Sequence, residues 1–143
     1  MSFDDTLTRC IARWQEEGIP LAPPIGAVEV RRAWERLGHP VSRDVIQLYG
    51  RVGGCSDYHF DEEYLWCLWT LSRIVEQNDR GSVTGVQFCD HSIQVVTWEL
   101  HFENEEHSSV WQVLGRDPGD TRMTSPDLDT FFRTYLDDPW RLL

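Results

Sequence analysis

The spacing of apolar residues changes in the middle of this chain, and that change limits the folds it can adopt. Up to Val52 the apolar residues recur every three or four positions, which is the period of an amphipathic helix. In several stretches from Tyr64 onward they alternate or run together, as they do in β-strands. The sequence therefore predicts helices first and a sheet after them, an order typical of α+β proteins.

Three helices are predicted in the first part of the chain. Their ranges are Thr6–Gly18, Ala27–Leu37 and a third helix that follows Ser42 and ends at Gly53-Gly54. Ser42 is a favourable N-cap residue, and glycine follows each helix as a stop signal. A Pro-rich connector, residues 21–24, separates the first two helices.

Four strands and two more helices are predicted in the second part. The strands are Tyr64–Trp69, Val86–Cys89, Ile93–Phe102 and Val110–Leu114, and the helices are Ser72–Asn78 and one capped by Ser125. Tyr64–Trp69 is apolar on both faces, which is typical of a central, covered strand. The stretch Gly115–Ser125 is predicted to be a loop. Short strand connections favour a mostly antiparallel sheet, or a mixed one, flanked by helices in a single domain, residues 1–143.

The charge of the chain is unevenly distributed, and all of its cationic side chains are arginines. The formal net charge is −11. Residues 1–51 contain seven arginines and seven acids, so the excess of negative charge lies in residues 52–143. This field repels nucleic acid and anionic membranes, and it speeds encounters with basic proteins. The absence of lysine also excludes Schiff-base, P-loop and kinase lysines.

The cysteines and the apolar runs indicate the compartment. The four cysteines, at positions 10, 55, 67 and 89, form no C-x-x-C pair and lie in or beside apolar segments, so we expect reduced, buried thiols. The first residues lack the pattern of a signal peptide, and no apolar run approaches the length of a bilayer span. We therefore expect a cytoplasmic protein.

Two short stretches combine acids with histidines, as some metal sites do. Asp57, His59 and Asp61 share one face if their segment is extended. In segment 101–107 the two histidines are six residues apart and fit no zincin motif. An exposed loop and a solvated hairpin explain these stretches equally well. Cys55 precedes His59, but acidic surroundings oppose its thiolate. The sequence therefore predicts no metal, no cofactor and no catalytic residue.

Four stretches of the chain carry a resemblance to a known family. They are residues 40–49 running into Gly53-Gly54, the Trp-bearing residues 65–69, residues 85–90 with the strand after them, and the closing helix 128–136. Together they resemble the SUKH superfamily, which joins a fungal regulator of cell-wall synthesis to many bacterial toxin-immunity proteins. The likeness spans residues 27–137. It implies an α+β sheet domain with flanking helices and no catalytic residues.

These observations lead to one main hypothesis and two alternatives. The main hypothesis is a non-enzymatic binding domain, an immunity protein that occludes a basic toxin domain such as a nuclease. The residues predicted to contact this partner are Asp57, Asp61, Glu62, Glu63, Glu103, Glu105 and Glu106, with Trp140 as an apolar anchor. The alternatives are a regulatory or scaffold module for an endogenous protein, and a metal-dependent hydrolase that uses Asp57, His59, Asp61 or segment 101–107.

Overall fold

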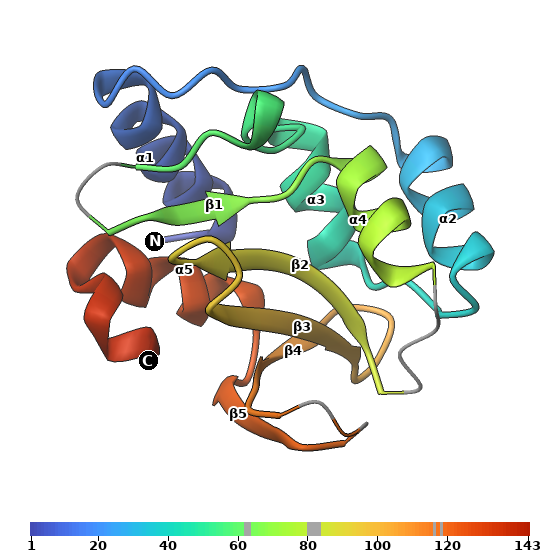
Figure 1. Cartoon of the computed structure of the whole chain (residues 1–143). Coiled ribbons are helices and arrows are strands. Elements are labelled where there is room, and N and C mark those ends of the chain that lie inside the picture. Colours follow the sequence, from blue (N-terminus) through green and yellow to red (C-terminus); the bar gives the residue numbers. More distant parts are fainter. Residues whose placement is uncertain (62–63, 80–83, 116, 118) are drawn as a thin grey trace.

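The computed structural model describes residues 1–61, 64–79, 84–115, 117 and 119–143 (Figure 1). Its helices are α1 (Phe3–Glu16), α2 (Ala27–Arg36), α3 (Arg43–Arg51), α4 (Leu71–Asn78) and α5 (Leu128–Asp137), with short 3₁₀-helices η1 (Ser56–Tyr58) and η2 (Pro139–Leu142). Its strands are β1 (Trp66–Leu68), β2 (Val86–His91), β3 (Val96–Phe102), β4 (Ser108–Val113) and β5 (Thr121–Ser125). Helices and strands thus follow the predicted order.

The strands form one antiparallel sheet in which each strand pairs with its neighbours along the chain. The order is β1-β2-β3-β4-β5. The central strand β3 pairs antiparallel with β2 on one side and with β4 on the other. The prediction of a single α+β domain with a mostly antiparallel sheet is confirmed, and every described strand pair is antiparallel.

The strand β1 lies at the edge of the sheet, so the prediction of a central strand was wrong. Its residues are nevertheless buried, because other segments cover its outer edge. The Cys55 amide donates to the Leu68 carbonyl at 2.8 Å, and the Asp61 amide donates to the Trp66 carbonyl at 3.3 Å. A strand that is apolar on both faces thus indicates burial, but not its place in the sheet.

An aromatic core joins the two ends of the chain to the sheet. Trp14 of α1 stacks on Trp66 of β1 with ring centroids 6.0 Å apart, and Trp66 packs on Tyr135 of α5 at 4.6 Å. The Trp14 indole donates a hydrogen bond to the Tyr135 hydroxyl at 2.8 Å. Phe131 of α5 contacts Trp98 of β3, with centroids 5.8 Å apart. These buried rings each stabilise the fold by about 2–3 kcal/mol.

The first helix begins earlier than the sequence predicted. α1 starts at Phe3, not at Thr6, because Ser2 and Asp5 form a capping box. The Ser2 hydroxyl accepts from the Asp5 amide at 3.2 Å, and the Asp5 carboxylate accepts from the Ser2 amide at the same distance. The hydrogen bond from the Ser2 amide, the Ser2 hydroxyl and the charge of the N-terminal amino group of Met1 lower the pKa of the Asp5 carboxyl.

The stretch predicted as a loop, Gly115–Ser125, contains the edge strand β5. Its residues are mostly polar and largely exposed, so it lacks the alternation that reveals a strand. Ser125 ends β5 and does not cap the last helix. Asp127 has that role, because its carboxylate accepts from the Thr130 amide at 2.7 Å.

All four cysteines are buried free thiols, and burial raises the pKa of Cys10 to about 12. Among the described residues, every helix is too short or too polar to cross a bilayer.

Candidate functional site

The acidic hairpin between β3 and β4 has a tight, hydrogen-bonded tip, residues 103–107. The amides of Glu103 and Asn104 both donate to the His107 carbonyl, at 3.1 and 3.2 Å. The Asn104 side-chain oxygen accepts from the amides of Glu106 and His107, at 2.8 and 2.9 Å. Asn side chains that bond the following backbone amides are typical of turns. The tip therefore holds one defined conformation.

Backbone hydrogen bonds join this tip to the first turn of α3. The Arg43 amide donates to the Glu105 carbonyl at 2.8 Å, and the Asp44 amide donates to the Glu106 carbonyl at 3.2 Å. The first amides of a helix have no partner within the helix, so the hairpin carbonyls satisfy them. Ser42, which the sequence predicted as the capping side chain, makes no capping hydrogen bond.

A buried polar network lies beneath this contact. The Ser42 hydroxyl lies 2.5 Å from the Asp44 carboxylate and 2.6 Å from the Ser108 hydroxyl. The Ser108 amide donates to both Asp44 oxygens at 3.2 Å. Burial raises the pKa of Asp44, and the hydrogen bonds from Ser42 and Ser108 oppose this by favouring the carboxylate. Asp44 therefore links the start of α3 to the start of β4 and fixes the hairpin.

The three glutamates of the tip lie in different surroundings. Glu103 accepts from the Ser109 hydroxyl at 2.6 Å, and Glu106 forms a surface ion pair with Arg43 at 2.8 Å. The Glu105 side chain is exposed, and no described residue forms a hydrogen bond or ion pair with its carboxylate. Glu105 is therefore the carboxylate of the tip that is most available to a partner.

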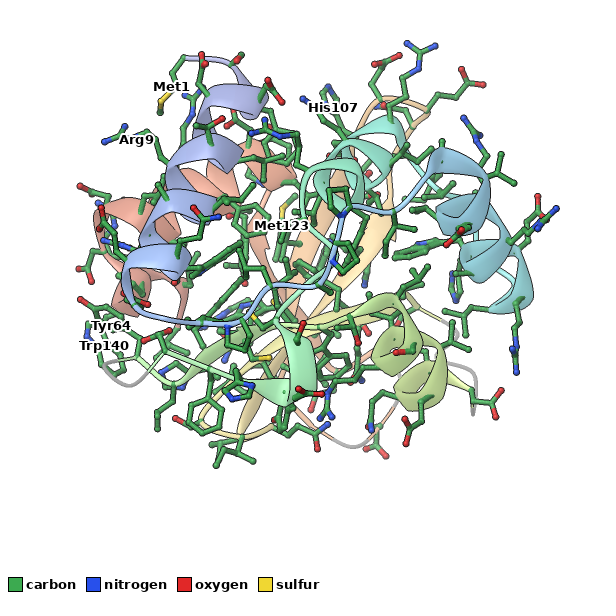
Figure 2. All side chains as sticks on the ribbon, turned by 90° about the horizontal axis from the view of Figure 1, so that it is seen from above. Met1, Arg9, Tyr64, His107, Met123 and Trp140 are labelled. Carbon is green, nitrogen blue, oxygen red and sulfur yellow. The ribbon has the colours of Figure 1, made fainter. Side chains whose placement is uncertain are left out.

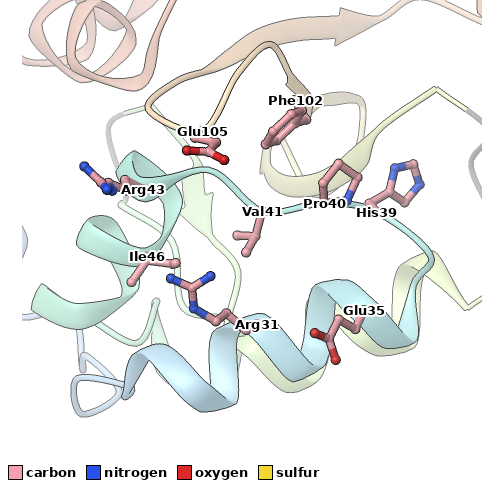
Figure 3. Close-up of a pocket in the computed structure, with 9 residues that line it drawn as sticks. All are labelled: Arg31, Glu35, His39, Pro40, Val41, Arg43, Ile46, Phe102 and Glu105. Carbon is pink, nitrogen blue, oxygen red and sulfur yellow. The ribbon is translucent and has the colours of Figure 1, made fainter.

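A groove of about 430 Å³, the hairpin groove, separates the tip from α2 and α3 (Figure 3). Its lining residues are Arg31, Glu35, His39, Pro40, Val41, Arg43, Ile46, Phe102 and Glu105. In Figure 3 Arg31 points from α2 toward Ile46 and Val41, and Glu105 and Phe102 lie on the other wall. The Phe102 side chain is 40% exposed. The hairpin groove thus combines an apolar floor with charges of both signs.

The structure brings together only some of the residues predicted to contact a partner. Glu103, Glu105 and Glu106 share the hairpin tip, whereas Asp57 lies exposed in η1, beside the start of α4. Glu62 and Glu63 lie outside the described residues. The predicted acidic residues therefore occupy more than one part of the surface.

Asp61 was wrongly predicted as a surface contact, because the structure buries it at 1% exposure. Its carboxylate accepts from the amides of Tyr64 and Trp66, at 2.5 and 3.1 Å. These bonds hold the turn that leads into β1, which gives Asp61 a structural role.

Trp140 is half exposed, but it lies away from the hairpin tip. Its ring makes edge-on contacts with Tyr64 and His91, with centroids 5.6 and 5.3 Å apart. Figure 2 shows Trp140 and Tyr64 together at one end of the molecule and His107 at another. With 53% of its surface exposed, Trp140 remains free to contact a partner, but not as part of the hairpin surface.

The acid–histidine stretches do not assemble into a metal centre among the described residues. The His59 ring lies 2.7 Å from the Ser56 carbonyl, and the Asp61 carboxylate is occupied by backbone amides. In the second stretch His101 contacts Glu99 at 2.7 Å and stacks on Trp111, with centroids 4.8 Å apart. Gly85 leaves room for this ring, since a Cβ there would lie 2.5 Å from the His101 ring. These contacts give the first stretch and His101 structural roles.

Sequence reasoning missed the hairpin groove. Its apolar floor comes from residues 41 and 46, and the wall on the hairpin side comes from residues 102 and 105. Only the fold brings these two segments together. The one signal in the sequence is an aromatic residue at the end of a strand: Phe102 is 40% exposed, whereas Trp98 and Leu100 of the same strand are buried.

Stability should depend on pH through Asp90, a buried carboxylate that accepts from the Tyr58 hydroxyl at 2.5 Å and the Trp69 indole at 3.1 Å. Burial raises its pKa above the ordinary value of about 4, so the folded chain binds this proton more tightly than the unfolded chain. The contribution of Asp90 to stability therefore falls as pH rises from about 4 through the folded pKa. We expect Asp90→Asn, which cannot ionise, to gain stability relative to the wild type over this range. Urea unfolding of both proteins at several pH values checks this, and a constant difference in stability would contradict it.

Comparison with known proteins indicates no family for this chain. No protein-family model matches this chain, and no curated protein matches it.

Proposed function

We propose that this chain is a non-enzymatic binding domain, and that it binds a basic protein through the hairpin tip and the hairpin groove. The observation that carries the proposal is the fixed conformation of the acidic tip. Backbone bonds from α3 and the buried Asp44 network hold residues 103–107 in place before any partner arrives. A partner then binds without ordering this loop, which otherwise costs conformational entropy.

The charges and the groove have complementary roles in this proposal. The net charge of −11 attracts a basic partner and speeds the encounter, with a rate that falls as salt increases. The hairpin groove offers an apolar floor beside Glu105, where an anchoring side chain of the partner can be buried. Charge thus supports fast association, and the groove supports a slow dissociation.

We further propose that the partner is a toxin domain and that this chain is its immunity protein. The resemblance to the SUKH superfamily and the acidic hairpin support this. A nuclease toxin presents a basic cleft for phosphates, and a fixed acidic tip that exposes the Glu105 carboxylate can occupy such a cleft. A regulatory module that binds an endogenous basic protein would use the same surface, and only the identity of the partner separates the two.

Reversing the charge of Glu105 is expected to weaken partner binding by about 10- to 100-fold, because Glu105→Arg places a cation at the centre of the contact. The full chain would be co-expressed with a candidate toxin domain taken from a neighbouring gene, and growth rescue and co-purification would be measured. The matched control is Glu16→Arg in the last turn of α1, which changes the net charge equally on an exposed site away from the hairpin.

The outcomes test two claims separately: which surface of this chain binds, and which protein is its partner. Rescue by the wild type and by Glu16→Arg, but not by Glu105→Arg, would support both. Equal rescue by all three would mean that the hairpin surface is the wrong one. If the toxin domain is toxic and the wild-type chain does not rescue growth, this toxin is not the partner. Capture of a basic endogenous protein, abolished by Glu105→Arg, would then favour the regulatory module.

A further inference from the structure

A second groove lies between α2 and α4, which run side by side in Figure 1. This helix groove has a volume of about 680 Å³. Its lining residues are Arg32, Ala33, Arg36, Leu71, Ser72, Val75, Glu76 and Asp79. It lies on a different face of α2 from the hairpin groove, which Arg31 and Glu35 line.

The two walls of the helix groove carry opposite charges. Arg32 and Arg36 lie one helical turn apart on α2. Glu76 lies in α4, one turn before Asp79, the C-cap residue of that helix. Among the described residues, none of these four side chains forms an ion pair. In particular, the arginines of one wall do not pair with the acids of the other wall. The groove thus presents a basic wall and an acidic wall that form no ion pair among the described residues.

Between the charged walls lies a short apolar floor. Leu71 and Val75 of α4 are partly exposed, and Ala33 of α2 lies beside them. Val28 is 61% exposed and precedes Arg32 by one turn, so it extends the apolar surface along the same face of α2. An apolar strip flanked by charges of opposite sign is complementary to a second copy of itself, because the basic side of one copy can face the acidic side of the other.

A two-fold axis can bring the opposite charges of two copies together. An axis that runs along the groove, between α2 and α4, places α2 of one protomer over α4 of the other. Each basic wall then faces an acidic wall, and the two apolar floors meet between them. Such an interface is isologous, so every ion pair forms twice. An axis across the helices would instead place like charges together, which disfavours it.

We propose that this chain associates with a second copy of itself through the helix groove, as a two-fold dimer. The dimer buries the apolar floor and pairs Arg32 and Arg36 with Glu76 and Asp79 of the other copy. It leaves the hairpin tip and the hairpin groove exposed. The proposal does not depend on the proposed function, and each protomer of the dimer keeps its own partner surface.

The test is a charge swap across the groove, read by sedimentation velocity over a concentration series at low salt. The wild type should dimerise, and added salt should weaken the dimer. Arg32→Glu/Arg36→Glu makes both walls acidic, and Glu76→Arg/Asp79→Arg makes both walls basic. Each of these variants should show a dissociation constant at least about tenfold higher than the wild type. An equimolar mixture of the two should form a heterodimer.

The variant that carries all four substitutions is the matched control. It has the net charge of the wild type and restores opposite charges to the two walls, so it should dimerise again. Circular dichroism would confirm that each variant is folded. Glu76→Arg/Asp79→Arg places cations near the C-terminus of α4, which favours the helix and keeps the test valid if the other variant unfolds.

Three results would overturn the proposal. The first is a wild type that remains monomeric at every concentration. The second is a dimer whose dissociation constant is the same in the folded variants as in the wild type. The third is a mixture of the two folded variants that forms no heterodimer. Because the hairpin is not involved, a monomeric variant should still bind the basic partner.

Discussion

Replacing Asp44 by alanine is expected to lower the free energy of unfolding by about 3 kcal/mol and to release the hairpin tip from α3. The Asp44 carboxylate is the shared acceptor for the Ser108 amide and the Ser42 hydroxyl, and it is 7% exposed. Alanine leaves these buried donors without their acceptor. Urea unfolding measures the loss, and hydrogen exchange of the Ser108 amide reports the release.

The matched control is Asp44→Asn, which keeps one oxygen acceptor in nearly the same volume. We expect it to cost about 1 kcal/mol, because only part of the network is lost. If the hairpin is fixed for binding, Asp44→Ala should also weaken partner binding although Asp44 is buried. An unchanged exchange rate at Ser108 in the alanine variant would show that Asp44 does not hold the hairpin.

Replacing Gly54 by alanine is expected to destabilise the domain by about 4 kcal/mol, a large part of the stability of a typical domain. Gly54 has φ = +101°, and an added Cβ would lie 2.6 Å from the Trp69 carbonyl oxygen and 2.7 Å from the Thr70 amide nitrogen. Both contacts are with backbone, so neither can be relieved by a side-chain rotation. The measurement is urea or thermal unfolding of the full chain.

Gly18 provides the control that separates backbone conformation from steric contact. It also has a positive φ, +73°, but nothing lies within 4 Å of the position of its Cβ. Gly18→Ala should therefore cost only about 1–2 kcal/mol, the penalty of the left-handed conformation. Equal losses at the two positions would mean that the packing of Gly54 against the backbone of Trp69 and Thr70 adds nothing.

The sequence predicted the elements whose apolar residues face the core. The range predicted for the second helix differs from α2 by one residue, because its buried stripe is regular. The alternation in β3 was clear because Trp98 and Leu100 point into the core. β5 has no such alternation, since it pairs through its backbone while its side chains remain largely in water.

The candidate site was less predictable than the fold. A local sequence does not distinguish an acid that faces water from an acid that accepts backbone hydrogen bonds, and for that reason Asp61 was misassigned. Similarly, Ser42 has the residue type of a capping side chain, but carbonyls of a hairpin far along the chain accept from the first amides of α3. The Ser42 hydroxyl bonds to the Asp44 carboxylate instead. Both cases depend on tertiary contacts that local patterns do not contain.

The contact between α1 and α5 has a consequence for how the chain folds during synthesis. Trp14 and Tyr135 meet in the core although 121 residues separate them. Each strand of the sheet, by contrast, pairs with its sequence neighbour, so the hairpins can form soon after they leave the ribosome. The Trp66 ring stays without its Tyr135 partner until the last helix emerges. A nascent chain that has not yet formed α5 therefore exposes an aromatic surface at Trp66, and α5 covers it.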